Sequence, residues 1–199
     1  MMDVAIRQLG QPGDVGWVVQ AHGEVYAEEY GWDTSFEALV ARIMADYAAE
    51  HDPAREAGWI AETDGRRAGS VLCVAGDEPG TAVLRVLLVH PSARGLGLGG
   101  RLVDECLAFA AGAGYERMRL WTTDPLTRAR QVYLRRGFAL IREEPQRAFG
   151  ADLVGQTYLR EFATAGQRLT RAAQSPGKAQ TRGASRLPRV CDQLPLNPS

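Results

Sequence analysis

One stretch of the sequence decides the fold: Val83-Leu84-Arg85-Val86-Leu87-Leu88-Val89-His90-Pro91-Ser92-Ala93-Arg94-Gly95-Leu96-Gly97-Leu98-Gly99-Gly100-Arg101-Leu102-Val103. Its first part, 83–89, is apolar and rich in β-branched residues, which predicts a buried strand. Pro91 would end that strand, because proline has no backbone N–H to donate. Apolar residues then recur at helical spacing, at positions 98, 102, 103 and 106. The stretch therefore predicts a strand, a glycine-rich loop and a helix.

The loop carries glycines at positions 95, 97, 99 and 100, with Arg94 before them. Glycine lets the backbone approach a ligand closely and turn its N–H groups inward, and the next helix adds a partial positive charge at its N-terminus. This arrangement is typical of a phosphate-binding loop. A tight turn without a ligand is the alternative, which a single Gly-x-Gly would favour.

Two kinds of phosphate loop fit the glycine spacing. Read as Gly95-x-Gly97-x-x-Gly100, it matches a dinucleotide fingerprint, but that fingerprint follows its strand directly, whereas here His90 to Arg94 intervene. Read as Arg94-x-x-Gly97-x-Gly99, it resembles the acetyl-CoA loop of the GNAT-type N-acetyltransferases. In that family the loop amides and the helix end hold the CoA pyrophosphate.

A second motif favours the acetyltransferase resemblance. The segment 129–138 reads Ala-Arg-Gln-Val-Tyr-Leu-Arg-Arg-Gly-Phe and resembles the family's helix with a tyrosine, Tyr133, four residues before Gly-Phe. Gly137 would end this helix and Phe138 would open the next strand. The resemblance covers roughly 4–162. It implies an α/β (α+β) fold, the GNAT acyl-CoA N-acyltransferase fold, with a mixed central sheet of about seven strands flanked by four helices.

Hydrophobic periodicity and turn residues predict the remaining elements. We expect strands at 4–9, 58–62, 68–75, 83–89, 117–122, 138–143 and 153–162, and helices from 14 to 30, from 34 to about 51, from 98 to about 111 and from 125 to 136. Residues 1–163 would form the catalytic domain. Residues 164–199 are rich in Pro, Gly, Ser, Gln and Arg and contain no aromatic residue, so we expect a disordered basic tail.

Composition indicates an ordinary globular protein. The 199 residues are 45% hydrophobic, with no apolar run long enough to span a membrane and no signal peptide. The three cysteines are scattered, which predicts a reducing cytoplasm, no disulfide framework and no metal site. After Phe162 the chain holds six basic residues and one acidic residue, whereas the rest holds 17 basic and 23 acidic. This acidic body suits an amine-bearing acceptor and argues against nucleic acid.

A narrower resemblance concerns several short segments. Segments 16–19, 22–23, 29–33, 51–53 and 152–157 resemble the acetyltransferase half of bacterial proteins in which that domain is fused to a MarR-type winged helix. The 199 residues show no such winged helix, so a regulatory role of the DNA-binding half does not transfer. The resemblance implies a bacterial protein.

The family resemblance implies a cofactor site around the central strand and the loop. Acetyl-CoA would be the co-substrate, with its pantetheine arm against the backbone of Leu87, Leu88 and Val89, and Thr123 where the arm passes. Arg130 would either reach the CoA phosphates or remain a solvated helix charge. The loop residues expected to bind the cofactor are Arg94, Gly95, Leu96, Gly97, Leu98, Gly99 and Gly100.

The resemblance also implies the catalytic groups. Tyr133 would donate a proton to the departing thiolate, unless it only packs in the core, and the Val89 backbone N–H would polarise the thioester carbonyl. Where the family often has a base on the central strand, this sequence has Arg85. That puts a carboxylate base in doubt and leaves Glu28, Glu29 and Glu62 as candidates.

The acceptor would lie against the first helix. His22, Tyr26 and Tyr30 recur at four-residue intervals, beside Glu29, and would either line the acceptor site or pack in the core. We therefore expect an N-acetyltransferase that moves acetyl from acetyl-CoA to a small-molecule or protein amine by direct attack in a ternary complex. The alternative is a non-catalytic acyl-CoA-binding sensor. An unpaired edge among the closing strands would offer a homodimer surface.

Overall fold

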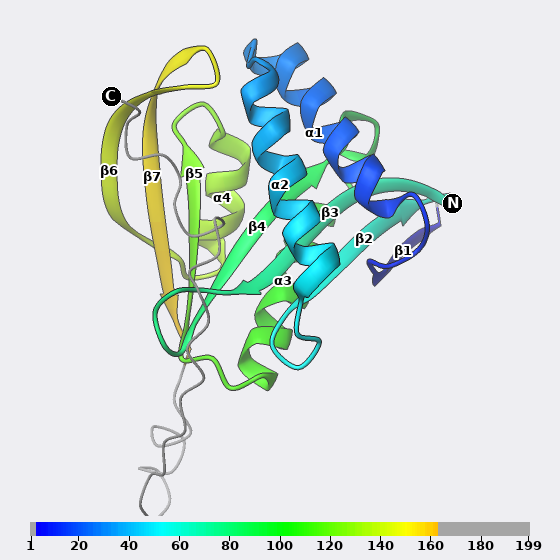
Figure 1. Cartoon of the computed structure of the whole chain (residues 1–199), viewed down its shortest axis with the longest axis vertical. Helices are drawn as coiled ribbons and strands as arrows, with labels where there is room; N and C mark the ends of the chain where they lie inside the picture. Colours follow the sequence, from blue (N-terminus) through cyan, green and yellow to red (C-terminus); the bar gives the residue numbers. More distant parts are fainter. Residues whose placement is uncertain (1–2, 163–199) are drawn as a thin grey trace, which may run out of the picture.

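The backbone forms one mixed seven-stranded sheet in the order β1-β2-β3-β4-β5-β7-β6 (Figure 1). The computed structural model describes residues 3–162. Its strands are β1 (Val4–Gln8), β2 (Ala57–Thr63), β3 (Arg66–Ala75), β4 (Thr81–Val89), β5 (Arg117–Thr123), β6 (Ala139–Ala148) and β7 (Ala151–Glu161). Its α-helices are α1 (Asp14–Tyr30), α2 (Thr34–Glu50), α3 (Leu98–Gly112) and α4 (Thr127–Arg135). The predicted fold class and element order are confirmed.

All neighbouring strands are antiparallel except β4 and β5, which are parallel and pair only from Thr81 opposite Arg117 to Leu84 opposite Leu120. Beyond these residues β4 runs on to Val89 and β5 to Thr123 without pairing to each other, and Figure 1 shows them diverging. A parallel doubly wound sheet, which the dinucleotide fingerprint requires, is not what residues 3–162 form. The divergence opens a wedge in the middle of the sheet.

A β-bulge interrupts β4 beside this wedge. Ser70 pairs with Leu88 and Leu72 with Arg85, so two residues of β4, Val86 and Leu87, stand opposite one residue of β3. Val86 has a φ of 45°, which is exceptional for a β-branched residue, and its carbonyl accepts a 3.0 Å hydrogen bond from the Ser70 hydroxyl. The extra residue reverses the side-chain alternation: Leu84 and Leu87 face the α3 core, whereas Val86 faces α1 and α2.

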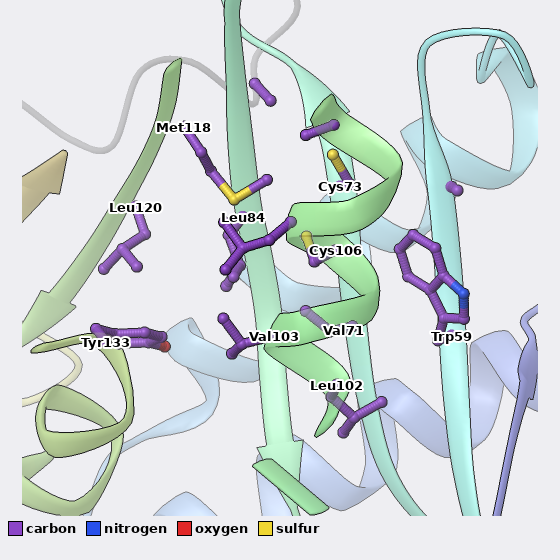
Figure 2. Close-up of a cluster of buried hydrophobic side chains, with 14 of the residues drawn as sticks. Trp59, Val71, Cys73, Leu84, Leu102, Val103, Cys106, Met118, Leu120 and Tyr133 are labelled. Atoms are coloured by element: carbon purple, nitrogen blue, oxygen red, sulfur yellow. The ribbon is translucent and has the colours of Figure 1, made fainter. Parts of the chain in front are cut away.

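Two apolar cores lie on opposite faces of the sheet. Helices α1 and α2 cover one face over Ile60, Leu72 and Val83. Helix α3 packs on the other face against β2, β3 and β4. Figure 2 shows this second core, in which Leu102, Val103 and Cys106 of α3 lie over the sheet and Tyr133 of α4 lies at its side; its labelled members are Trp59, Val71, Cys73, Leu84, Leu102, Val103, Cys106, Met118, Leu120 and Tyr133.

A buried carboxylate fixes the start of α1. Asp14 is 0% exposed and accepts hydrogen bonds from the backbone N–H groups of Gly10 and Gln11. It also forms ion pairs with Arg7 at 2.8 Å and Arg67 at 2.7 Å. Burial alone would raise the pKa of Asp14, but these donors outweigh it and hold the pKa well below its usual range. Because Arg7 and Arg67 belong to β1 and β3, the pairs fix α1 relative to the sheet.

Some predicted boundaries are wrong. Strand β6 runs to Ala148 rather than residue 143, because Glu144, Pro145 and Gln146 continue an exposed edge strand whose polar sequence lacks strand periodicity. Helix α4 begins at Thr127 rather than residue 125, and Asp33 caps α2 by accepting from the Ser35 N–H.

The predicted tail, 164–199, lies outside the described residues. Within 3–162, no helix is both long and apolar enough to cross a bilayer.

Candidate active site

A cavity of about 560 Å³ lies beside the end of β4, where this strand has separated from β5. Its walls come from α1, the end of β4, the glycine loop and the segment 126–132 around the start of α4. Most of the predicted cofactor residues line it, namely Leu87, Leu88, Val89, Arg94, Gly95, Gly97, Leu98, Gly99 and Gly100, together with the predicted acceptor residues Tyr26, Glu29 and Tyr30. The loop and the strand that the sequence joins thus form one concave site.

The glycine loop presents unpaired backbone donors to this cavity. Gly95 and Gly97 have φ values of 85° and 72°, which only glycine adopts without strain, and a side chain there would meet nothing within 4 Å. Gly97 is the N-cap of α3 and provides no side-chain hydrogen bond. The Arg101 N–H donates to the Gly97 carbonyl and so closes the first turn of the helix. The first N–H groups of α3 therefore remain available to an anion.

A second arginine, which the sequence analysis missed, lies against the first turn of α3. Arg136 donates to both carboxylate oxygens of Asp104, at 2.7 and 2.8 Å, and a Cβ added to Gly100 would collide with its guanidinium. A side chain at position 100 would therefore have to displace the Arg136 guanidinium. The position of Arg136 just before Gly137 carried no sequence signal for this contact.

An ion pair joins α1 to the loop at the larger cavity. Arg94 Nη1 lies 2.6 Å from Glu29 Oε1, and both side chains are about one quarter to one third exposed (30% and 25%). Burial raises the pKa of nearby Tyr30, and Glu29 raises it further, whereas Arg94 lowers it. Glu29, expected at the acceptor, therefore shares the loop end of the cavity with Arg94.

The end of β4 directs backbone donors into the wedge. The His90 N–H donates to the Ala68 carbonyl at 2.8 Å, on the β3 side. Successive N–H groups along a strand alternate in direction, so the Val89 N–H points away from β3, toward the side where β5 has left the sheet. Residues 87–89 thus offer strand-edge groups that an extended ligand could pair with.

Tyr133 lies where the cavity walls meet the core. Its side chain is 5% exposed, its ring contacts Phe138 and Tyr158, and Figure 2 shows it beside Val103 and Leu120. It also lines a second, smaller cavity. Burial, the main cause, raises the pKa of Tyr133 well above its usual range, so the hydroxyl keeps its proton at neutral pH. Tyr133 thus packs in the core and also lines the smaller cavity.

The smaller cavity, about 90 Å³, adjoins the larger one and shares Tyr26, Leu87, Leu126 and Ala129 with it. We call it the acceptor chamber, because His22 and Tyr26, two of the residues predicted to bind the acceptor, line it. His22 contributes to it from α1: its Nδ1 lies 2.7 Å from the Val18 carbonyl, and burial lowers the pKa of His22 to about 4. The ring is therefore neutral at pH 7, with Nδ1–H donating to that carbonyl and the Nε2 lone pair left over.

Several predicted residues lie elsewhere. Leu96 is 39% exposed and Thr123 is 0% exposed, and neither is among the described residues that line the two cavities. Arg130 lines neither and donates to Gln156 at 3.5 Å. Of the base candidates, Glu62 is ion-paired with Arg7 at 2.8 Å and Glu28 is exposed outside both cavities.

Comparisons with known proteins agree with this geometry. Residues 19–138 match the family model described as the acetyltransferase (GNAT) family. An uncharacterized N-acetyltransferase of Schizosaccharomyces pombe is 32% identical over 116 residues, which are 57% of this chain and 69% of that protein.

Solved structures share the fold at low sequence identity. The yncA protein of Salmonella typhimurium, described as an acetyltransferase with its cofactor acetyl-CoA, has a TM-score of 0.66 at 18% identity, covering 81% of this chain and 95% of that one. A GNAT-family acetyltransferase of Streptococcus pneumoniae has a TM-score of 0.63 at 18% identity, covering 80% of this chain and 100% of that one. With the wedge, the glycine loop and the tyrosine helix in place, this chain belongs to the GNAT family of acetyltransferases.

Proposed function

We propose that this protein is an N-acetyltransferase that moves an acetyl group from acetyl-CoA to an amine by direct attack in a ternary complex. The observation that carries the proposal is the 560 Å³ cavity, with uncapped helix N–H groups at one end and Tyr133 beside the adjoining chamber.

The residues present fit the acetyl-CoA pyrophosphate. The donors at the start of α3, the open space over Gly95 and Gly97, and the charge of Arg94 suit an anion. The strand-edge groups of 87–89 suit the amides of a pantetheine arm in the same way that they would suit a neighbouring strand. When bound, acetyl-CoA supplies a thioester whose acetyl group an amine can attack.

Two groups of the chain would then assist the transfer. The Val89 N–H, directed into the wedge, would donate a hydrogen bond to the thioester carbonyl and stabilise the charge that develops on its oxygen. The Tyr133 hydroxyl, kept protonated by its raised pKa, would donate a proton to the departing sulfur.

The environment of Cys106 also supports direct attack over a covalent cysteine intermediate. Cys106 is 0% exposed, contacts the Leu72 carbonyl at 3.6 Å through Sγ and has its pKa raised by burial. A buried, protonated thiol is a poor nucleophile. Positioning of the two substrates is then the main contribution of the protein.

The proposal also covers the cellular location, the oligomeric state and the acceptor. The resemblance to the acetyltransferase half of bacterial MarR fusion proteins supports a bacterial enzyme, and the scattered cysteines support a cytoplasmic one. Strand β6 is an unpaired sheet edge with Leu140 and Ile141 42% and 55% exposed, which would suit a homodimer. The acceptor is an amine of a small molecule or a protein.

The proposal is tested by measuring CoA release from acetyl-CoA with and without a panel of amines. Amine-dependent release supports transfer. Thermal unfolding run in parallel separates the alternative sensor function: ligand at about 100 times its Kd should stabilise the fold by about 2.7 kcal/mol. Stabilisation by acetyl-CoA without release to any amine would favour the sensor, and the absence of both would contradict either function.

A further inference from the structure

Arg85 is the charged residue of the acceptor chamber. The chamber is lined by aromatic and aliphatic side chains of α1 and α2, by 84–87 of β4, by Trp121 and Thr122 of β5, and by Tyr133 of α4. Among the described residues that line it, Arg85 alone carries a charge, and none is Asp or Glu. An acceptor that presents only an ammonium group would meet a cation and no carboxylate there.

Arg85 is held at the point where the wedge opens. It follows Leu84, the last residue of β4 that pairs with β5, and precedes Val86, whose φ of 45° marks the bulge. Its side chain therefore lines the chamber from a part of β4 that is paired with β3 and no longer with β5. A planar guanidinium binds carboxylates and similar anions through two parallel N–H donors.

Two buried polar atoms accompany Arg85. His22 is 1% exposed and Thr122 is 3% exposed, and both line the chamber. Among the described residues, neither His22 Nε2 nor Thr122 Oγ1 has a hydrogen-bond partner. Buried polar atoms are normally hydrogen-bonded, so two without partners at one cavity indicate a polar ligand group. The neutral His22 can accept a hydrogen bond at Nε2, and the Thr122 hydroxyl can donate or accept.

The volume of the chamber limits the acceptor. At about 90 Å³, against about 560 Å³ for the adjoining cavity, it suits a small acceptor. The apolar walls formed by Phe36, Leu39, Val40 and Ile43 suit a short hydrocarbon portion. A long cationic chain would fit neither this size nor this charge.

From these observations we propose that the acceptor is a small zwitterionic amine of the α-amino acid type, whose anionic group is bound by Arg85. The inference rests on the proposed acetyl transfer and names its substrate class.

The test compares matched acceptors with the full-length protein. Alanine, leucine and methionine are each assayed for CoA release beside their amides and the amines left by decarboxylation, which lack the anion, and beside aminomethylphosphonate, which carries a different one. We expect amino acids to exceed their amides and amines by at least about 30-fold in kcat/KM, because a charge-assisted hydrogen bond is lost. Activity with the phosphonate would extend the anion beyond carboxylate.

Arg85→Met then removes the charge at similar length. It should lower kcat/KM for amino acids by about 30- to 100-fold and change the values for amides and amines by less than about 3-fold, while Arg85→Lys restores part of the loss. Arg42→Met, an exposed arginine on the outer side of α2, is the matched control and should change neither. Unfolding with and without acetyl-CoA checks that each variant is folded.

The outcomes separate the two proposals. Equal use of amino acids and their amides, or equal loss on both with Arg85→Met, would overturn the inference and leave acetyl transfer intact. If no amine supports CoA release, calorimetric titration of the acetyl-CoA-loaded protein with the amino acids and amides decides instead. Arg85-dependent binding of the amino acids alone would sustain the chamber's specificity while acetyl transfer fails, and no preference would overturn both.

Discussion

The two cavities that meet at Leu87 are built by different means. The larger is made mainly from backbone, with glycines at positive φ, uncapped helix N–H groups and partly exposed charged side chains. The acceptor chamber is made from buried side chains that five elements, α1, α2, β4, β5 and α4, bring together. The first depends on conformational freedom in one short segment, and the second on which side chain stands at each wall. The larger cavity should therefore be sensitive to substitutions that restrict the backbone, and the chamber to substitutions that change a side chain.

The strongest test of this contrast concerns backbone freedom. Gly97→Val places a β-branched residue at a φ of 72° in the loop, and we expect it to lower kcat/KM for acetyl-CoA by at least about 100-fold and to abolish the stabilisation by acetyl-CoA. Gly65→Val is a matched control, since Gly65 has the same φ of 72° and also has open space around it, in the turn between β2 and β3. Both should lose about 1–2 kcal/mol of stability. Equal loss of acetyl-CoA binding in both would refute a specific role for the loop.

The next test removes one oxygen from the chamber. Tyr133→Phe keeps the buried ring, so stability and acetyl-CoA affinity should hardly change, while kcat should fall about 10- to 100-fold if the hydroxyl is the proton donor. Tyr115→Phe is the control: it loses a 2.9 Å hydrogen bond to the Arg55 carbonyl and should cost about 1 kcal/mol of stability with kcat unchanged. An unchanged kcat in Tyr133→Phe would leave only the packing role.

A third test uses pH to probe how dry the chamber is. The pKa of His22 is lowered from 6.5 to about 4 in the fold, so between these values the unfolded state binds more protons and stability falls as pH falls. Between pH 7 and pH 5 the free energy of unfolding, measured with urea, should fall by about 2 kcal/mol. His22→Leu should flatten that slope. The same slope in wild type and variant would mean that water reaches the ring.

The smallest effect concerns Glu29 and decides to which cavity it belongs. Exposed ion pairs contribute little, so Glu29→Gln should raise acetyl-CoA affinity by only about 2- to 5-fold, by releasing Arg94 and removing a negative charge near the phosphates. The gain should shrink at high salt. A higher KM for the amine, with acetyl-CoA affinity unchanged, would instead place Glu29 at the acceptor.

The same contrast explains what the sequence could predict. The loop site is contiguous, so the strand, the glycines and the helix start were predicted from residues 83–103 alone, and the tyrosine helix from its Gly-Phe ending. The positive φ of Val86 was not predicted, because β-branched residues strongly favour extended backbone and only the pairing with β3 imposes the bulge.

The acceptor chamber was predicted only in part for a related reason. His22 and Tyr26 were singled out by their spacing on one helix, but no local pattern indicates that Arg85 and Thr122 would line the same space. They come from two strands that are neighbours for only four residue pairs. Similarly, no sequence pattern indicated the contact of Arg136 with Gly100, which depends on how α3 and α4 pack.

The short contact between β4 and β5 also determines where the molecule should open first. Strands β1 to β4 and strands β5 to β7 are two antiparallel ribbons joined edge to edge by Thr81–Leu84 against Arg117–Leu120. Few backbone bonds cross this seam, so fluctuations that part the ribbons need not unfold either one. Amide exchange in β4 should be faster along its free edge, residues 86–89, than in the part that pairs with β5. A ligand that contacts both ribbons in the wedge would hold them together, so that they unfold cooperatively.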